Sequence, residues 1–243
     1  MSSDSPGPAG QVSIVVPTYR ESENLPLLVP RIDAALRGAD LSGEIVIVDD
    51  DSRDGSVEAV AALAEAGLPV RIIVRQGERG LSTAVLRGFD ESAGEYLLCM
   101  DADLSHPPEA IPGMVELLTS GQADFVLASR FCPGGSTDAE WGVFRWLNSK
   151  VAQLLARPLT RLADPMSGFF ALPREVYARA ASLNPIGYKI ALELMIKCDC
   201  RRIREVPIHF ADRRLGQSKL NVREQVNYLR HLRRLYAYRI FRR

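Results

Sequence analysis

Two aspartates separated by a single residue, Asp101 and Asp103, are the side chains of this sequence best placed to do chemistry. They follow the apolar run 96–100, which is typical of a buried strand, and Pro107-Pro108 prevents that strand from continuing. Because side chains alternate along a strand, both carboxylates can point the same way. A divalent cation would relieve their repulsion, and Mg²⁺ commonly takes one or two carboxylates plus substrate phosphates. The pair predicts a metal site, although two hydrated aspartates at a strand end explain so short a motif equally well.

The elements that must position these carboxylates alternate between strand and helix. Apolar strands are expected at 12–16, 44–49, 70–74, 96–100 and 125–128, and helices at 24–37, 57–66, 80–91 and 111–120. Nearly continuous apolar strands are typical of a mostly parallel sheet that helices cover on both faces. The predicted fold class is therefore α/β.

Ligands of such sheets bind beyond the carboxyl ends of the strands. Several of the expected strands are followed there by polar side chains, namely Tyr19, Glu21, Asp50, Asp101, Asp103 and Arg130. Convergence of so many polar strand ends on one edge is less easily explained by chance than any single one. The carboxyl edge of the sheet is thus the predicted site.

Beyond Arg130 the pattern is less regular. Helices are expected at 141–156, 174–181 and 189–200, a strand at 203–210 and a last helix at 221–239. Wound at 100° per residue, the last helix places six apolar side chains on one stripe with arginines on its flank: Val222, Val226, Leu229, Leu232, Tyr236 and Ile240. This pattern fits a helix packed on the domain or a basic amphipathic helix at an anionic membrane surface.

The charge is unevenly distributed although the chain as a whole is neutral. Residues 201–243 hold 13 Lys or Arg against 3 Asp or Glu, so this part carries +10 and the rest −10. An anionic partner is therefore expected near the C-terminal part. No apolar run approaches the ~20 residues that span a bilayer. The first ten residues are rich in Ser, Pro and Gly, which predicts disorder rather than a signal peptide.

The spacing of the four cysteines, Cys99, Cys132, Cys198 and Cys200, fits neither a zinc site nor a redox motif, so reduced thiols and a cytosolic protein are expected.

No P-loop and no Gly-x-Gly-x-x-Gly follows the first strand, which disfavours dinucleotide-binding, P-loop and nucleotidyltransferase readings. Arg213 and Lys219 flank a glycine loop and could neutralise a leaving diphosphate, whereas a solvated loop is the simpler reading of that segment alone.

Six segments, taken as an ordered set over residues 12–222, resemble the family-2 glycosyltransferases, and most closely their polyprenyl-phosphate mannose synthase branch. The segments are Pro17-Thr18-Tyr19-Arg20-Glu21, 48–55, 101–108, Ser129-Arg130-Phe131, 164–170 and 213–220. The resemblance implies a GT-A fold over residues 11–220, after a disordered 1–10 and before a basic amphipathic helix at 221–243. It implies an inverting enzyme that moves mannose from GDP-mannose to a dolichyl or polyprenyl phosphate with Mg²⁺ or Mn²⁺.

Carried onto this sequence, the resemblance assigns three groups of residues. The nucleoside would be held by Pro17, Tyr19, Glu21, Val48 and Asp50. The metal and diphosphate would be held by Asp101, Ala102 and Asp103, with Ser105 at a position where some relatives use Gln as a ligand. Phosphates or sugar would be contacted by Arg130, Lys189, Arg213 and Lys219. The catalytic roles would fall to Asp103, Arg213 and Lys219.

A phosphate acceptor needs no general base because it is already ionised at pH 7, with a second pKa of about 6. His106 is accordingly interpreted as structural. Many relatives continue into transmembrane helices, whereas this sequence ends at Arg243. A peripheral position on the cytosolic face of a membrane is expected, with the C-terminal helix as the contact, small membrane-protein subunits as further partners and no nucleic acid. Two alternatives stay open: a polyprenyl-phosphate glucosyltransferase that uses UDP-glucose, and a non-catalytic membrane-docking subunit.

Overall fold

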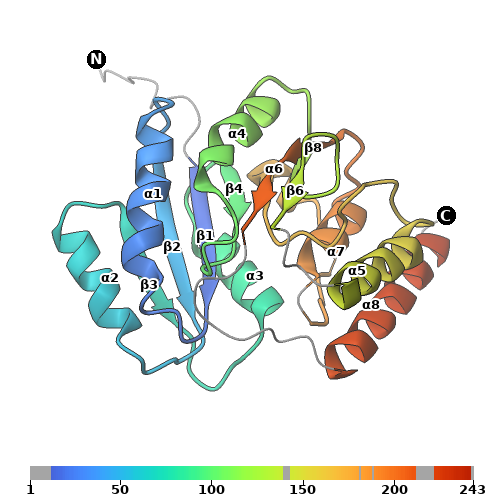
Figure 1. Ribbon diagram of the computed structural model, residues 1–243, viewed down its shortest axis with the longest axis horizontal. Helices are drawn as coiled ribbons and strands as arrows, with labels where there is room; N and C mark the ends of the chain where they lie inside the picture. The colour runs from blue at the N-terminus through green and yellow to red at the C-terminus, as the bar shows by residue number, and fades with distance from the viewer. Residues whose placement is uncertain (1–11, 139–142, 181, 188, 212–221, 242–243) are drawn as a thin grey trace, which may run out of the picture.

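The computed structural model describes residues 12–138, 143–180, 182–187, 189–211 and 222–241. Within these ranges a seven-stranded sheet has the order β3-β2-β1-β4-β7-β5-β8 (Figure 1). Neighbouring strands are parallel except where β7 pairs with β4 and β5. The strands are β1 Val12–Thr18, β2 Gly43–Asp49, β3 Val70–Val74, β4 Tyr96–Cys99, β5 Phe125–Ser129, β7 Phe170–Pro173 and β8 Ile203–Pro207. The expected mostly parallel sheet is confirmed.

Helices cover both faces of this sheet, as expected for strands that are apolar on both sides. The helices are α1 Leu25–Arg37, α2 Ser56–Glu65, α3 Leu81–Glu91, η1 Pro108–Ala110, α4 Ile111–Thr119, α5 Val143–Ala156, α6 Arg174–Tyr177, α7 Ile190–Lys197 and α8 Val222–Phe241. One core cluster joins the sheet to α1, α2 and α4. The other joins its opposite face to α3, α7 and α8. Helices α5 and α8 lie side by side at one end of the molecule (Figure 1).

The strand expected at 203–210 is divided in two by the structure. β8 ends at Pro207, and His209–Phe210 (β9) pairs instead with Ser136–Thr137 (β6) in a small separate sheet. Ile208 joins the two, because its N–H donates to Ser129 O at 3.0 Å and its carbonyl accepts from Ser136 N at 3.0 Å. Periodicity alone could not show this exchange of pairing partners. The helices expected at 174–181 and 189–200 also end sooner, at Tyr177 and Lys197.

The C-terminal helix buries a different stripe from the expected one. Tyr228, His231, Leu232 and Leu235 are buried. Leu229 and Ile240 of the expected stripe are instead 52% and 66% exposed, and Val226 is 40% exposed. Leu232 therefore belongs to the buried face, while much of the expected stripe faces outward. The difference arises because a buried polar contact between His231 and Glu193 on α7 fixes the rotation of α8.

Glu193 on α7 is the centre of that buried polar contact and is only 1% exposed. Its Oε1 accepts from Lys197 Nζ at 2.6 Å and from Asn184 N at 2.9 Å. Its Oε2 lies 3.0 Å from Nε2 of the buried His231 on α8, a close polar contact that does not meet the geometry of a hydrogen bond. Burial alone would raise the pKa of Glu193, but its contacts with His231, Lys197 and the Asn184 N–H outweigh burial and lower the pKa.

We expect Glu193→Gln to lower the free energy of unfolding at pH 7 by about 3 kcal/mol, because Lys197 would lose its buried counter-charge and His231 its carboxylate partner. A depressed folded pKa means that the carboxylate contributes stability above its unfolded pKa of about 4.5, and that this is lost as the pH falls through the folded value. Urea unfolding between pH 3 and 7 should therefore show a shallower acid dependence in the variant.

Glu65→Gln is the matched control, because Glu65 is exposed at the end of α2. It should change the unfolding free energy by less than about 0.5 kcal/mol at any pH. If Glu193→Gln were as stable as this control and kept the full acid dependence, the buried contact would not anchor α8.

Candidate active site

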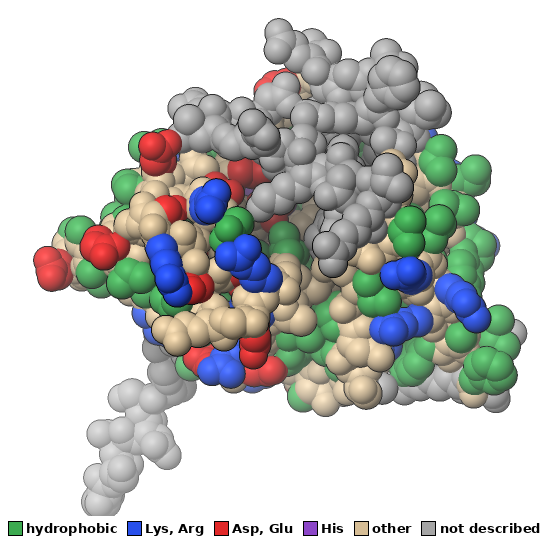
Figure 2. Space-filling view, turned by 90° about the horizontal axis from the view of Figure 1, so that it is seen from below, with side chains coloured by type: hydrophobic (Ala, Val, Ile, Leu, Met, Phe, Trp, Pro, Cys, Tyr) green, Lys and Arg blue, Asp and Glu red, His purple; other side chains and the backbone are tan. Residues whose placement is uncertain are grey.

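The carboxyl ends of β1, β2, β4 and β5 lie at one edge of the sheet. Register fixes this arrangement, because Thr18 pairs with Asp49 and Val15 pairs with Cys99. The edge faces the viewer in Figure 2, where acidic and basic side chains gather over one half of it. The polar residues that follow these strands are therefore brought together as expected. Among the described residues, loops from other parts of the chain reach the same edge, including the loop between β3 and α3 and the segment around Gly168.

Tyr19 forms an aromatic surface at the end of β1. The guanidinium of Arg79 lies 4.6 Å from the centre of its ring and that of Arg20 lies 5.3 Å away. Glu21 accepts from Asn24 Nδ2 at 2.7 Å, just before α1 begins. Pro17 pairs in register with Val48, which is fully buried. Tyr19 can therefore present a flat surface to a base, whereas Val48 contributes to the core beneath the site.

Asp50 at the end of β2 is already held by a cation. It is 7% exposed, and its Oδ1 accepts from Arg75 Nε at 2.8 Å and also from Arg75 Nη2. Its Oδ2 accepts from the backbone N–H of Gly80 at 2.8 Å. The pair thereby ties the loop between β3 and α3 to the sheet edge. Arg75 was missed from the sequence, although it stands directly after β3 and the same strand-end rule could have found it.

The backbone around Asp101 and Asp103 is a tight loop rather than a continued strand. β4 ends at Cys99, and Leu104 adopts a left-handed φ of 63°. Asp103 Oδ1 accepts from Ser105 N at 3.1 Å, and Ala102 between the aspartates is buried. The two carboxylates were expected to point the same way because side chains alternate along a strand. That reason is wrong, because both residues lie in a loop and the loop determines their directions.

The side chains of this loop supply oxygen ligands, which are the ligands that a hard cation prefers. Asp101 and Asp103 supply carboxylate oxygens, and the buried Ser105 Oγ finds no hydrogen-bond partner among the described residues. Among the residues that the structure describes, no three His, Cys, Asp or Glu side chains lie together so that they could hold a metal ion by themselves. A cation here would need further oxygen ligands from elsewhere, which the phosphates of a substrate can supply.

His106 fixes the backbone of Asp101. Its Nδ1 accepts the N–H of Asp101 at 3.1 Å, which places the imidazole proton on Nε2 and keeps the ring neutral. Burial lowers the pKa of His106, although the charges of Asp101 and Asp103 act in the opposite direction. The ring is 2% exposed and packs between Phe169 and Phe210. Its contacts agree with the structural interpretation from the sequence.

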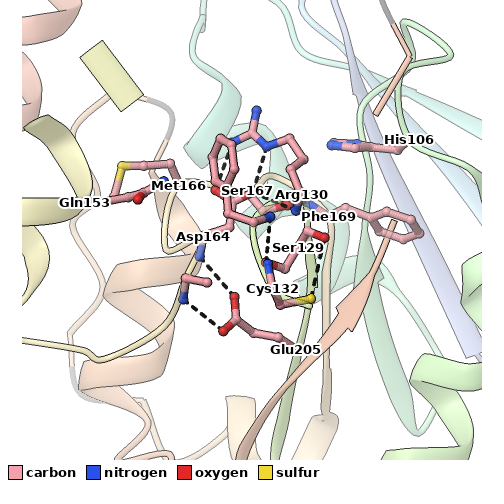
Figure 3. Close-up of polar contacts among 12 residues, drawn as sticks. His106, Ser129, Arg130, Cys132, Gln153, Asp164, Met166, Ser167, Phe169 and Glu205 are labelled. Carbon is pink, nitrogen blue, oxygen red and sulfur yellow. Dashed lines mark hydrogen bonds and ion pairs between the residues drawn. The ribbon is translucent and has the colours of Figure 1, made fainter. Parts of the chain in front are cut away.

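Arg130 at the end of β5 is oriented by a chain of buried contacts (Figure 3). Its Nε and Nη2 donate to the two oxygens of Asp164 at 2.7 and 2.9 Å, and Asp164 is fully buried. Glu205 on β8 in turn accepts from the backbone N–H groups of Ala163 and Asp164, at 2.9 and 3.0 Å. The guanidinium is thus fixed through Asp164 by a strand of the sheet. Glu205 carried no sequence signal, because it sits within a strand.

The remaining predicted residues are placed less fully. Lys189 precedes α7 and donates to Met166 O at 2.9 Å, so it contacts the segment 164–170. In that segment Gly168 lies against Asp101: a Cβ at this position would lie 3.3 Å from Asp101 Oδ1. Arg213 and Lys219 lie outside the described residues. The structure therefore brings Lys189 near the segment beside Asp101, and the roles of Arg213 and Lys219 stay predictions.

Comparison with known proteins agrees with this arrangement. Residues 13–180 match the model of glycosyl transferase family 2. The chain is 47% identical over 234 residues to a dolichol-phosphate mannosyltransferase of Mycosarcoma maydis, covering 93% of this chain and 79% of that protein. It is 44% identical over 237 residues to the dolichol-phosphate mannosyltransferase of Saccharomyces cerevisiae, covering 94% of this chain and 88% of that protein.

Solved structures support the expected GT-A fold. Glucosyl-3-phosphoglycerate synthase from Mycobacterium tuberculosis, in complex with Mn²⁺, UDP and glucosyl-3-phosphoglycerate, superposes with a TM-score of 0.67 at 19% identity. The match covers 95% of this chain and 80% of that one. A complex of the same enzyme with Mn²⁺, UDP-glucose and phosphoglyceric acid gives 0.65 at 18% identity over 93% and 78%. At this identity the likeness concerns the fold.

We expect Glu205→Gln to lower the free energy of unfolding by about 1–3 kcal/mol, because one of the two backbone N–H donors would face an amide NH₂. Urea unfolding at pH 7 measures the change. Glu116→Gln, exposed on α4, is the control and should change it by less than about 0.5 kcal/mol. Equal stability of the two variants would show that Glu205 does not hold the segment that positions Asp164 and Arg130.

Proposed function

Because this chain belongs to glycosyl transferase family 2, and is thus a glycosyltransferase, we propose that it transfers mannose from GDP-mannose to dolichyl or another polyprenyl phosphate. The observation that carries the proposal is its 44–47% identity, over more than nine-tenths of the chain, to proteins named dolichol-phosphate mannosyltransferases. The loop at 101–105 supports it, since its oxygen-only donor set suits a metal-bound diphosphate.

The proposed cofactor is Mg²⁺ or Mn²⁺, held by Asp101 and Asp103 with Ser105 Oγ as a further oxygen. When bound, such a cation offsets the negative charge that develops on a leaving diphosphate. The chain's own contribution is to fix these oxygens: His106 holds the backbone of Asp101, and Ser105 N holds Asp103. Gly168 leaves space beside the Asp101 carboxylate that any side chain would reduce.

The chemistry proposed for the transfer is a single displacement with inversion at the sugar carbon. The acceptor phosphate is ionised at pH 7, so the residues need to orient it and to exclude water rather than remove a proton. Arg130, held rigid by Asp164, would contact phosphate or sugar, as would Lys189, Arg213 and Lys219. The guanine base would stack on Tyr19 beside Arg79, and the contact of Asp50 with Arg75 fixes the loop that carries Arg79.

The acceptor is too apolar to leave a bilayer, so the enzyme must meet it at the membrane surface. In the part of the chain that the structure describes, no helix combines the length and the apolar character needed to cross a bilayer. Helices α5 and α8 instead expose several apolar side chains: Val151, Leu154, Leu155, Val226, Leu229, Ile240 and Phe241. Arg230, Arg233 and Arg234 on α8 are exposed as well. Hydrophobic and basic side chains lie beside each other toward this end of the molecule in Figure 2.

We propose that this α5–α8 surface rests on an anionic cytosolic membrane face, since apolar and basic side chains together suit its boundary. Each arginine close to such a surface contributes about 1 kcal/mol, and salt screens this attraction. Small membrane-protein subunits could bind the same surface, and the vesicle experiment below distinguishes lipid from protein because it contains only lipid.

The purified protein, given Mg²⁺, a polyprenyl phosphate in detergent and either radiolabelled GDP-mannose or UDP-glucose, should move label into the lipid phase from GDP-mannose at least about tenfold faster. Label from UDP-glucose alone would establish the glucosyltransferase alternative. Label from neither donor, with a folded protein, would favour a non-catalytic subunit. Asp103→Asn should reduce transfer by about a hundredfold or more, as expected when a preorganised charge at a reacting diphosphate is removed.

Asp40→Asn is the matched control, because Asp40 is exposed and asparagine tolerates its left-handed φ of 52°. It should leave the transfer rate within about twofold of the parent. Wild-type rates for Asp103→Asn at limiting metal would contradict the assignment of Asp103.

Replacing Ile240 and Phe241 together by Gln should weaken co-sedimentation with anionic vesicles by about tenfold or more, because burial of one such side chain is worth roughly 1.5–3 kcal/mol. Turnover of membrane-embedded acceptor should fall with it, whereas a short water-soluble prenyl phosphate should be used at the parent rate. Leu27→Gln, at a side chain that is 51% exposed on α1, should change neither. If vesicle binding did not change with salt, lipid charge or these substitutions, the proposed surface would be excluded.

Removing residues 236–243 would be a poorer test, because Tyr236 and Arg239 donate hydrogen bonds to the end of α5 and the loop after it.

A further inference from the structure

The loops that follow β1 and β2 contain three residues other than glycine with a left-handed backbone. Arg20 has a φ of 63°, and Asp51 and Arg53 each have a φ of 52°. Residues with a Cβ seldom adopt this conformation, and they keep it only where the surrounding structure holds the chain. Arg20 follows Tyr19 directly, and Asp51 follows Asp50. The two loops at the candidate site therefore need contacts that hold them in place.

A chain of hydrogen bonds that starts at Asp49 supplies such a contact. Asp49 is buried; its Oδ1 accepts from Ser52 N at 2.8 Å, and its Oδ2 accepts from Ser52 Oγ at 2.5 Å and Thr18 Oγ1 at 2.9 Å. Because the Ser52 hydroxyl gives its proton to Asp49, its oxygen is left to accept, and it accepts the N–H of Arg20 at 2.8 Å. The carboxylate thus holds the backbone next to Tyr19 through one hydroxyl.

Asp54 forms a second contact between the same two loops. Its Oδ2 accepts from Ser22 N at 3.1 Å, while its Oδ1 accepts from Ser56 N at 3.1 Å and from Ser56 Oγ at 2.7 Å. Burial alone would raise the pKa of Asp54, but the hydrogen bonds from Ser56 and Ser22 outweigh burial and lower it. Two backbone N–H groups on either side of Glu21 are therefore bound by side chains of the loop after β2.

We propose that Ser52, oriented by Asp49, is a positioning residue for the nucleoside site. It fixes the backbone that carries Tyr19 and Glu21, and it acts through the N–H of Arg20. The inference rests on the proposed function, which assigns Tyr19 and Glu21 to the nucleoside. A loop that is already ordered loses less conformational freedom when it binds a ligand, so its affinity is higher. Nucleotide affinity should therefore depend on the Ser52 hydroxyl.

Ser52→Ala removes the hydroxyl that joins Asp49 to the N–H of Arg20. We expect the Kd of GDP, measured by titration calorimetry in the presence of Mg²⁺, to rise by about tenfold or more. UDP is titrated in parallel, so that the result does not depend on the base that the site prefers. The KM of the nucleotide sugar should rise by the same factor, whereas kcat at saturating donor should change by less than about twofold.

Ser13→Ala is the matched control, because Ser13 makes the same kind of contact at the opposite end of β1. Its buried Oγ donates to Glu44 Oε1 at 2.7 Å and accepts from Gly94 N at 2.8 Å. Both variants lose a buried hydroxyl, so both should unfold at lower urea concentration than the parent. Ser13→Ala should nevertheless leave the Kd of the nucleotide within about twofold of the parent value. Nucleotide affinity thus separates positioning from a structural role alone.

Two further variants test the path from Asp49 to the backbone. Asp49→Asn replaces one acceptor oxygen by an NH₂ group and should also raise the Kd. Asparagine tolerates a left-handed φ better than arginine does, so Arg20→Asn should reduce the dependence on Ser52. In the Arg20→Asn background, Ser52→Ala should raise the Kd by less than about threefold. Circular dichroism checks that each variant is folded.

The outcomes distinguish this inference from the proposed function. A parent that binds GDP or UDP but moves no mannose to lipid would contradict the proposed function, while the Kd values would still decide the role of Ser52. Equal Kd values for Ser52→Ala and the parent would overturn that role, as would an equally large effect of Ser13→Ala or an undiminished effect in the Arg20→Asn background. A parent that binds neither nucleotide would overturn both.

Discussion

Three buried carboxylates lie against basic side chains, and these contacts organise the loops of the structure. Arg75 holds Asp50, Arg130 holds Asp164, and Lys197 with His231 holds Glu193. Loss of one partner from such a pair typically costs 3–5 kcal/mol, far more than an exposed pair is worth. The first two pairs join positions 25 and 34 residues apart at the sheet edge, and the third joins two helices. Loops that would otherwise be mobile are therefore held in fixed positions around the site.

Asp101 stands in a different environment. His106 lies beside its carboxylate, 3.9 Å away, and that imidazole is neutral because its Nδ1 accepts a backbone N–H. The side chain of Asp101 is also 28% exposed, whereas those of Asp50 and Asp164 are 9% and 0% exposed. Thus Arg75 and Arg130 balance the deeper Asp50 and Asp164, whereas the carboxylate of Asp101, in the loop proposed to bind a metal, is more accessible. That contrast separates the two kinds of aspartate more clearly than the motifs do.

The sequence predicted the strands and most helix boundaries because apolar periodicity reports burial, and burial decides where regular elements form. It also predicted that Tyr19, Asp50, Asp101 and Arg130 would share an edge, because parallel strands impose this. It could not show that Asp49 and Asp50 would both be buried, or that Arg75 would bind Asp50, since a side chain's partner depends on the course of the loops. Which side of α8 packs on the domain stayed open for a related reason: the apolar pattern marks out Leu229, whereas the structure buries the side that carries His231.

The contact between His231 and Glu193 also determines which side chains α8 exposes at the surface. With His231 turned inward against Glu193, the opposite side of α8 must face outward, and there Leu229 and Ile240 cannot reach the core. An apolar side chain left in water contributes nothing to folding, so a helix that exposes several of them is stabilised chiefly by its buried side. The tyrosine hydroxyls of α8 reinforce the same rotation, since Tyr228 donates to Ala152 O at 2.7 Å on α5. The contacts that attach α8 to the catalytic domain are therefore the ones that turn an apolar and basic surface away from it, as attachment to a membrane would require.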